Sequence, residues 1–377
     1  MKEIDKERRI DDTKMLWHMD RVIKHFDRGE RIPPVHIDAG LTKRCNMRCV
    51  YCYGYFQNMT GEVMGRKAVL DNLVKSSAEI GVRSLAFIGD GEPSLNPAYW
   101  EAMRLGNKLG LSLNTSTNGI LVDNDYKRES ILKCDWMRVN ISAFSKKGFE
   151  KIHTSKLRDK VLKNIIDLVK YRDKNKIDCE IGIQTVFVPT LMMKELVSLS
   201  QFAIDNGVDF FSIKQCSLPD KGESGMSQFD LNLYSENKIQ NLLEKVENMS
   251  TEKTKIIPKW RTMERKGVRK YDGCPAIPLI LETSGNGDCY PCGYLFGNKK
   301  EFLKYKFGNL HQNSLKEMVY SDKYWEIIRQ MRYEFDVHKL CKGECRQMRT
   351  NEFIWDYLHP PKVIRKMKAR GVFNKNE

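Results

Sequence analysis

Residues 41–56 read Leu-Thr-Lys-Arg-Cys-Asn-Met-Arg-Cys-Val-Tyr-Cys-Tyr-Gly-Tyr-Phe, and this short stretch carries three cysteines, Cys45, Cys49 and Cys52. Their spacing allows one loop to fold three thiolates around a single metal centre. Cysteine thiolates are the usual ligands of iron–sulfur clusters. A four-iron cluster held by only three of them keeps one iron without a protein ligand, and chemistry takes place at that open position.

A second motif extends this pattern. The arrangement Cys-x3-Cys-x-aromatic-Cys, followed downstream by Gly89-Asp90-Gly91-Glu92-Pro93, resembles the radical S-adenosylmethionine (SAM) superfamily. The resemblance implies that the three cysteines bind a [4Fe–4S] cluster whose open iron chelates the amino and carboxylate groups of SAM. Reductive cleavage of SAM then yields a 5′-deoxyadenosyl radical. A zinc knuckle is the alternative, but it requires a fourth ligand nearby, and the next cysteine is Cys134.

The composition predicts a globular protein outside the membrane. The chain has 377 residues, of which 41% are hydrophobic and 30% charged, enough for one large and one smaller domain. No apolar run approaches the roughly 18 residues that cross a bilayer. The first residues, Met-Lys-Glu-Ile-Asp-Lys-Glu-Arg-Arg, lack the apolar region of a signal peptide. We therefore expect a cytoplasmic location, in a reducing compartment that suits oxygen-sensitive clusters, and no membrane partner.

The formal net charge is +15 at pH 7. A lysine-rich solvated surface explains such a charge, and so does an acidic partner such as a nucleotide-linked or phosphorylated substrate. The basic residues are scattered and no aromatic platform motif lies among them, which disfavours a nucleic-acid partner, tRNA included. The charge is compatible with a small-molecule substrate that is acidic or sugar-linked.

Hydrophobic periodicity alternates between strands and helices over residues 35–214. Six strands alternating with helices predict an α/β fold with a parallel sheet and right-handed crossovers. The resemblance implies the partial (β/α)6 TIM-type barrel of the radical SAM core, with a small C-terminal β-hairpin/α iron–sulfur domain. The expected strands are 35–39, 84–88, 111–115, 136–141, 180–188 and 209–214, and the expected helices are 66–80, 99–109, 160–175 and 193–206.

We divide the chain into five segments. Residues 1–34 predict an amphipathic helical lead-in, too short for an independent leader-peptide-binding domain, and residues 35–251 predict the barrel, closed by a charged helix at 236–248. Residues 252–273 predict a basic linker, 274–360 an auxiliary-cluster domain of SPASM or twitch type, and 361–377 a basic tail. The turn-rich segment 216–236 predicts a mobile loop over the site.

Active sites of such barrels lie at the C-terminal ends of the strands, and the motifs fall there. By match to the family, Tyr51 packs near the adenine of SAM, and Gly91 with Glu92 receives the methionine amino group. Ordinary packing is the simpler interpretation of Tyr51. Polar residues at later strand ends are candidates for the SAM carboxylate and ribose hydroxyls, although such residues are common in turns. They are Thr117, Asn118, Ser142 and, within a strand, Gln184.

A second set of cysteines follows residue 270. Residues 279–292 predict a β-hairpin with a Gly-Asn-Gly turn. With the later Cys-Lys-Gly-Glu-Cys, the segment looks like the SPASM or shorter twitch extension of radical SAM enzymes, which carries auxiliary clusters. Five cysteines are too few for two fully ligated clusters, so we expect one auxiliary [4Fe–4S] cluster, with a zinc site as the alternative. By match to the pattern its ligands are Cys274, Cys292, Cys341 and Cys345, and Cys289 is the substitute for one of them.

Cys216 ends the sixth expected strand, where side chains point into the barrel mouth. A thiol there could return a hydrogen atom to a substrate radical, as radical SAM epimerases of sugars and aminoglycosides do. Cys289 is a weaker candidate for the same role. A free cysteine is also often a small buried apolar residue. Lys214 and Gln215 flank the same mouth and suit an acidic or hydroxylated substrate.

Three functions are compatible with these features. The first is a radical SAM oxidoreductase or epimerase that abstracts hydrogen from a small polar, sugar-like or aminoglycoside-like substrate, with a flavodoxin- or ferredoxin-type electron donor. The second is a peptide or protein modifier of the ribosomal-peptide or sulfatase-maturation type. The third is a non-catalytic iron–sulfur or zinc protein that binds nucleic acid, which leaves the motif at residues 89–93 unexplained.

Overall fold

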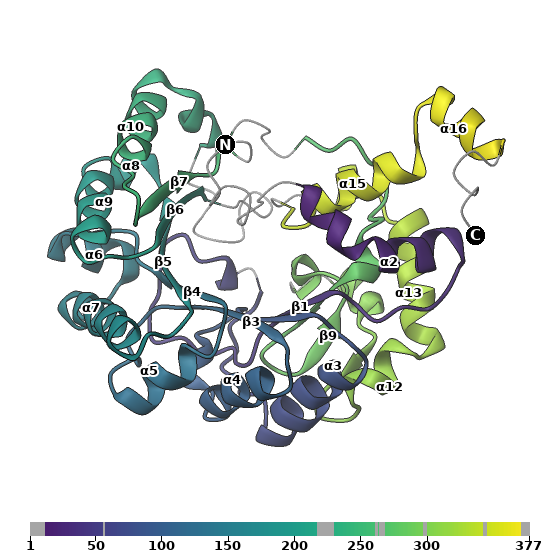
Figure 1. Cartoon of the computed structure of the whole chain (residues 1–377), viewed down its shortest axis with the longest axis horizontal. Coiled ribbons are helices and arrows are strands. Elements are labelled where there is room, and N and C mark those ends of the chain that lie inside the picture. Colours follow the sequence, from purple (N-terminus) through teal and green to yellow (C-terminus); the bar gives the residue numbers. More distant parts are fainter. Residues whose placement is uncertain are drawn as a thin grey trace.

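The computed structural model of the chain describes residues 12–55, 57–216, 230–260, 263, 268–296, 300–341 and 345–370. Its centre is a ten-stranded sheet in the order β10-β9-β8-β1-β2-β3-β4-β5-β6-β7. The sheet curves, and helices cover its outer side (Figure 1). The loop expected over the site, residues 216–236, lies outside the described residues from 217 to 229.

Strands β1 to β7 run parallel to one another, and the alternation predicted from periodicity is confirmed. The prediction of a basic linker over residues 252–273 needs a correction. Residues 255–258 form a further strand, β7, which pairs parallel with β6. The strands are β1 His36–Ala39, β2 Ser84–Phe87, β3 Ser112–Thr117, β4 Trp136–Asn140, β5 Glu180–Phe187, β6 Phe210–Gln215 and β7 Lys255–Pro258.

The expected crossover helices are present within a few residues of their predicted ends, and the first of them is mostly a π-helix. Three short helices, α5, α6 and α8, were not predicted. The helical elements of the barrel are η4 Ala68–Lys75, α3 Ser76–Glu79, α4 Tyr99–Lys108, α5 Asp125–Ile131, α6 Lys146–His153, α7 Arg158–Asn175, α8 Pro189–Met192, α9 Glu195–Asp205 and α10 Asn237–Glu247.

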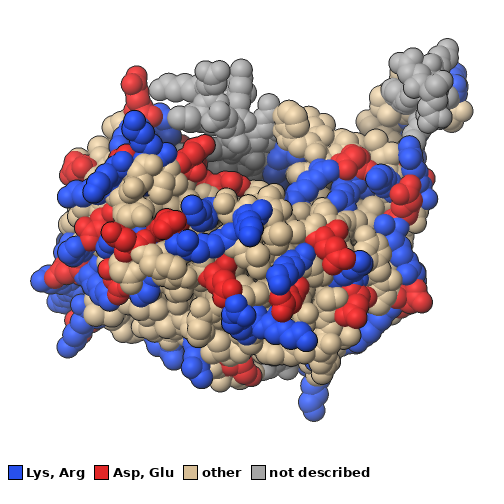
Figure 2. Space-filling view, turned by 60° about the horizontal axis from the view of Figure 1, so that its bottom comes forward, with Lys and Arg blue, Asp and Glu red and all other residues tan. Residues whose placement is uncertain are grey.

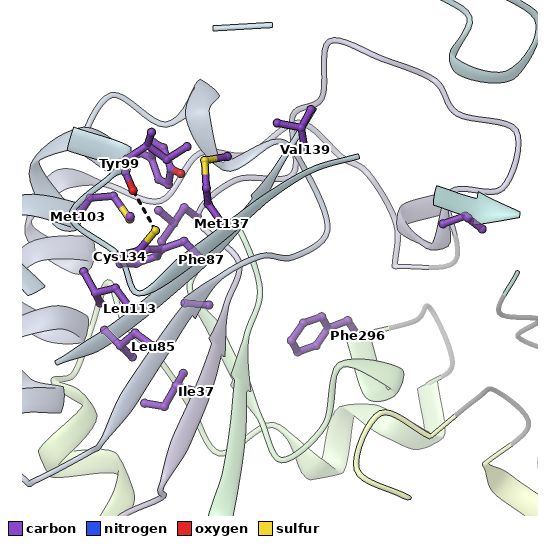
Figure 3. Close-up of a cluster of buried hydrophobic side chains, with 14 of the residues drawn as sticks. Ile37, Leu85, Phe87, Tyr99, Met103, Leu113, Cys134, Met137, Val139 and Phe296 are labelled. Atoms are coloured by element: carbon purple, nitrogen blue, oxygen red, sulfur yellow. Dashed lines mark hydrogen bonds between the residues drawn. The ribbon is translucent and has the colours of Figure 1, made fainter. Parts of the chain in front are cut away.

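Alternate strand residues divide between the two faces of the sheet. Ile37, Leu85, Leu113 and Met137 lie on four successive strands, are at most 1% exposed, and point to the helix side of the sheet (Figure 3). Met103 of α4 packs on the same side. Successive side chains of a strand point to opposite faces. In each strand, the neighbours of these apolar residues therefore point into the barrel, and many of them are polar.

The C-terminal region extends the sheet beyond β1. Strand β8, Ile280–Thr283, pairs parallel with β1, and β9, Asp288–Tyr290, returns antiparallel to it, which confirms the predicted hairpin. Gly287 in its turn has φ +86°, a conformation that glycine adopts without strain. The remaining elements are β10 Gly308–Asn309, α12 Leu315–Val319, α13 Asp322–Tyr333, α14 Val337–Leu340, α15 Met348–Leu358 and, in the basic tail, α16 Lys362–Ala369.

The N-terminal lead-in is helical over residues 12–27, and residues 28–34 connect it to β1 without regular structure. The helical part consists of η1 Asp12–His18, α2 Met19–Val22 and a π-helical turn, η2 Ile23–Asp27. Met15 and Val22 pack with Leu279 and Ile354 in a small second core. The lead-in therefore packs against the C-terminal region.

Basic and acidic side chains are interspersed over the face shown in Figure 2. Many of them pair, as Arg66 does with Glu101 and Lys146 with Asp159. None of the described helices is long and apolar enough to cross a membrane.

Candidate SAM and iron–sulfur sites

The cysteine-rich loop leaves the C-terminal end of β1. Cys45, Cys49 and Cys52 are all partly accessible and none forms a disulfide. The backbone N–H of Cys52 donates to the carbonyl of Cys49 at 3.0 Å, so the second half of the motif is a turn that brings two thiols to one side. Burial and the neighbouring thiols raise the pKa of the Cys49 thiol. The positive charge of bound iron would offset this rise in pKa. Three partly accessible thiols in one loop suit such a cluster.

A histidine that sequence analysis did not identify lies against this loop. His153 ends α6, and its Nε2 accepts the backbone N–H of Ser142 at 2.9 Å. The proton of the neutral ring must then be on Nδ1, which lies 3.0 Å from Cys49 Sγ. Burial lowers the pKa of His153 to about 3, which keeps the ring neutral. Cys49 therefore receives an N–H···S hydrogen bond.

Tyr51 connects the loop to two strands through a chain of hydrogen bonds. Its hydroxyl donates to Asn140 Oδ1 at 2.6 Å and accepts from Ser142 Oγ at 2.8 Å. Ser142 Oγ in turn accepts the backbone N–H of Val186 at 3.1 Å. The ring is 7% exposed. The structure thus brings Tyr51 and Ser142 together, at the C-terminal ends of β4 and β5.

The Gly-Glu-Pro motif after β2 packs directly against the cysteine-rich loop. The backbone N–H of Glu92 donates to the carbonyl of Arg44 at 2.7 Å. A Cβ at Gly91 would overlap the carbonyl oxygens of Thr42 and Arg44. Only glycine fits this close approach of two backbones, so the motif and the loop form one unit.

The Glu92 carboxylate is buried and already accepts hydrogen bonds within the protein. Ser94 Oγ and Thr117 Oγ1 each donate to Oε1 at 2.5 Å, and the Asn118 backbone N–H donates to Oε2 at 2.7 Å. The Asn118 side chain donates to Asn46 Oδ1 at 2.5 Å. Thr117 and Asn118 therefore fix the Glu92 carboxylate, and the Asn118 side chain also binds the cluster loop. Oε2 keeps lone pairs that can accept a hydrogen bond from an ammonium group. Burial raises the pKa of Glu92.

Asp90, in the same motif, ties the cluster loop to the C-terminal hairpin. Its carboxylate accepts hydrogen bonds from Ser284 Oγ at 2.5 Å and from the Gly285 backbone N–H at 3.0 Å. Lys43 Nζ lies 3.6 Å from the same carboxylate. Sequence analysis assigned no role to Asp90, because both hairpin partners are almost 200 residues away in the chain.

The second set of cysteines surrounds a pocket in the C-terminal region. The four cysteines expected as auxiliary ligands all line it, whereas Cys289 does not. Cys289 lies on β9, fully buried, and its thiol contacts the carbonyl of Gly287 at 3.6 Å. Cys292 follows β9 and is not part of the strand. The lining cysteines are Cys274, Cys292, Cys341 and Cys345.

The same pocket supplies hydrogen-bond donors to the sulfur atoms. Asn351 Nδ2 donates to Cys274 Sγ at 3.5 Å and lies 3.8 Å from Cys345 Sγ, and Arg269 Nη2 donates to Cys341 Sγ at 3.4 Å. N–H donors and a guanidinium stabilise thiolates, which is the protonation state that ligates iron. Among the described residues no three His, Cys, Asp or Glu side chains gather closely enough to bind one metal ion. Four thiols around a pocket fit a larger cluster, and their role as its ligands stays a prediction.

Two candidates lie on the inner face of the barrel. Gln184 of β5 is 4% exposed and its Oε1 has no hydrogen-bond partner among the described residues. Cys216 is fully buried after β6, where its backbone N–H donates to the hydroxyl of Tyr234 at 3.0 Å. Its thiol is close enough to Lys214 to act on the charge of that lysine.

Comparison with known proteins agrees with this architecture. The model of the radical SAM superfamily matches residues 40–203, and that of the SPASM iron–sulfur cluster-binding domain matches residues 280–346. A SAM-dependent nucleotide dehydratase of Flammeovirga pacifica is 30% identical over 121 residues, 31% of this chain and 41% of that protein. The tungsten-containing aldehyde ferredoxin oxidoreductase cofactor-modifying protein of Pyrococcus furiosus is 25% identical over 75% of this chain and 80% of that protein.

Solved structures share the fold. Streptococcus suis SuiB bound to its precursor peptide SuiA superposes with a TM-score of 0.63 at 18% identity, covering 87% of this chain and 75% of that one. The enzyme anSMEcpe with bound AdoMet superposes with a TM-score of 0.55 at 18% identity, covering 89% and 96%. The cofactors are SAM, the SAM-binding [4Fe–4S] cluster and a SPASM auxiliary iron–sulfur cluster. The chain belongs to the radical SAM superfamily and carries a C-terminal SPASM iron–sulfur domain.

Proposed function

We propose that this radical SAM enzyme abstracts a hydrogen atom from an unactivated C–H bond of a small polar metabolite. When bound, the first cluster supplies one electron to SAM, whose cleavage gives the 5′-deoxyadenosyl radical. The observation that carries the proposal is the polar inner face beside Tyr51. Asn140, Gln184 and Ser212 stand in register on three neighbouring strands and point into the barrel.

The residues of this chain have distinct roles in the proposal. Tyr51, held by Asn140 and Ser142, packs against SAM and excludes water from the radical. Glu92 is fixed by its hydrogen bonds so that Oε2 accepts from the methionine ammonium. Gly91 lets this carboxylate approach the cluster loop.

Two outcomes follow abstraction. In epimerisation, Cys216 gives the hydrogen atom of its thiol to the substrate radical, and one electron from the flavodoxin- or ferredoxin-type donor with one proton from water restores the thiol. In dehydrogenation, the substrate radical loses a proton, and an auxiliary cluster held by the second set of cysteines would serve as acceptor of the remaining electron. The position of Cys216 directly after β6, at the C-terminal edge of the barrel, makes it the candidate donor for the first outcome. An accepted substrate turned over in deuterium oxide would then gain deuterium, and Cys216→Ala would abolish that gain.

The first experiment is anaerobic reconstitution with iron and sulfide, followed by dithionite and SAM. We expect about eight irons per chain and release of 5′-deoxyadenosine. The double variant Cys49→Ala/Cys52→Ala should lose about four irons and the release. A matched control is Cys179→Ala, since that cysteine is buried in the hydrophobic core away from the cluster loop. An intact first cluster without deoxyadenosine would refute the proposal.

A further inference from the structure

The inner face of the barrel carries a group of cationic side chains. Arg138 lies on β4 and Lys214 on β6, each between two residues that point to the helix side. Lys259 follows β7, and Arg346 comes from the C-terminal domain. The charges of Arg138, Lys259 and Arg346 lower the pKa of Lys214, and those of Arg138 and Arg346 lower the pKa of Lys259, so the four lie in one region of the interior. Like charges inside a protein repel one another and are costly unless an anion compensates them.

Among the residues that the structure describes, Arg346 is the one of the four that forms ion pairs, and the Asp38 carboxylate also acts on Arg138. Arg346 Nη1 lies 3.0 Å from Asp38 Oδ2 and 3.9 Å from Glu282 Oε2. Within the described part of the chain, neither Lys214 nor Lys259 has an ion pair. Burial and the surrounding cations lower the pKa of Lys214 to about 7 and that of Lys259 to about 8. The two lysines therefore bring positive charge to the barrel that no carboxylate among the described residues pairs with directly.

Polar atoms without partners lie beside these cations. Gln184 Oε1, Ser212 Oγ and Arg138 Nε are buried and form no hydrogen bond with any described residue. Gln184 is 4% and Ser212 5% exposed. The three residues come from the adjacent strands β4, β5 and β6 and point to the same inner face. Buried polar atoms are almost always satisfied in a native protein, so their partners are expected from a bound molecule.

Part of this group is accessible to such a molecule. The side chain of Arg346 is 54% accessible, and its Nη1 lies 3.0 Å from Asp38 Oδ2 on β1. The C-terminal domain therefore adds an accessible guanidinium beside the cations of the barrel.

We propose that Arg138, Lys214, Lys259, Gln184 and Ser212 form an inner cation site that binds a phosphoryl group of the substrate. A phosphoryl group carries a charge of about −1.5 to −2 and three acceptor oxygens. It can therefore neutralise and hydrogen-bond several cations at once, whereas a single carboxylate carries one negative charge. The site disfavours a positively charged aminoglycoside. This inference rests on the proposed function and narrows its substrate to a small phosphorylated metabolite.

The test is isothermal titration calorimetry on the anaerobically reconstituted protein. Inorganic pyrophosphate should bind, and Lys214→Met and Lys259→Met should each weaken it by about tenfold or more, the value of a hydrogen bond to a charged group. Lys146→Met is the matched control, because Lys146 is 77% exposed on α6 and pairs with Asp159. The affinities of ribose 5-phosphate and ATP are then compared. Tighter binding of ribose 5-phosphate indicates a sugar phosphate as the substrate, and tighter binding of ATP indicates a nucleotide.

Loss of folding is a separate readout. Replacing a buried lysine among like charges by methionine removes a desolvation cost, so both variants should melt no lower than the wild type. Citrate or succinate binding as tightly as pyrophosphate would overturn the assignment, as would equal loss of affinity in Lys146→Met. 5′-Deoxyadenosine release is measured in the same samples without anion. Pyrophosphate binding without release refutes the proposed function alone, whereas release without binding refutes the inner cation site alone.

Discussion

His153 Nδ1 lies 3.0 Å from Cys49 Sγ, while Nε2 of the same ring accepts the backbone N–H of Ser142 at 2.9 Å. The second bond fixes the tautomer, so the first is an N–H donated to the sulfur of an expected cluster ligand. Hydrogen bonds to cluster sulfurs set reduction potentials. They favour the reduced cluster, because its sulfurs carry more negative charge.

His153→Phe should lower the reduction potential of the SAM-binding cluster. About 1 kcal/mol of lost differential hydrogen bonding corresponds to roughly 40 mV for a one-electron couple. The measurement is a redox titration followed by electron paramagnetic resonance, with the iron content checked. Phe149→Leu is the matched control, because Phe149 packs 4.5 Å from the His153 ring and forms no hydrogen bond to the sulfur. An unchanged potential at full iron content would show that the histidine only supports the loop.

Cys292 and Cys289 form a natural pair of variants, since only Cys292 lines the auxiliary pocket. We expect Cys292→Ala to lose auxiliary iron, whereas Cys289→Ala keeps about eight irons per chain. Iron and sulfide analysis with Mössbauer spectra of the reconstituted variants measures this. Iron loss in Cys289→Ala with retention in Cys292→Ala would exchange the two assignments.

Glu92→Gln should impair both folding and SAM binding. The amide nitrogen that replaces Oε2 would face the backbone N–H of Asn118, so that two donors meet in a buried site. The cost is about 1–3 kcal/mol, seen as a lower Tm by circular dichroism, and calorimetry should show weaker SAM binding. Thr117→Val removes only one donor to Oε1 and serves as the comparison. Normal SAM affinity in Glu92→Gln would remove the carboxylate from the ammonium site.

Sulfate affinity of the inner cation site should rise as the pH falls from about 8.5 to 6.5, because Lys214 and Lys259 gain their protons over this range. Sulfate itself does not titrate there. Arg138, with a pKa lowered to about 10, stays charged. Calorimetry across this range measures the effect.

Other titratable groups face the same interior and set the control. Asp38 has its pKa lowered to about 2 by Arg346 and stays ionised. Burial raises the pKa of Glu282 to about 7, so its protonation acts in the same direction as that of the lysines. His36 is hydrogen-bonded to Asp38 at 3.1 Å. The Lys214→Met/Lys259→Met double variant should lose most of the pH dependence of sulfate binding. If the double variant keeps the full pH dependence, that dependence arises from these other groups.

The barrel was predictable because its first six strands alternate with amphipathic helices and leave a clear periodicity. Strand β7 was missed because Lys-Ile-Ile-Pro is short and lies within basic sequence, so only its pairing with β6 identifies it. The cysteines could be found from spacing alone. His153 could not, since it lies 104 residues from Cys49 and its role depends on where α6 ends.

The inner cations were the hardest to interpret from sequence. Arg138 in particular resembles any solvated residue of an alternating strand, since a strand pattern does not say which face meets water. Lys214 was placed at the barrel mouth, but its lowered pKa arises from neighbours on β4, beyond β7 and in the C-terminal domain. Such a site exists only once the chain is folded.

Strand β8 pairs with β1 residue by residue, from His36 with Ile280 to Ala39 with Thr283. The loop that leaves β1 carries the SAM-cluster cysteines, and the hairpin that leaves β8 leads to Cys292. Both expected cluster sites thus begin at neighbouring strands of one sheet. An electron that passed from one site to the other would tunnel across a span that these backbone hydrogen bonds help to fix.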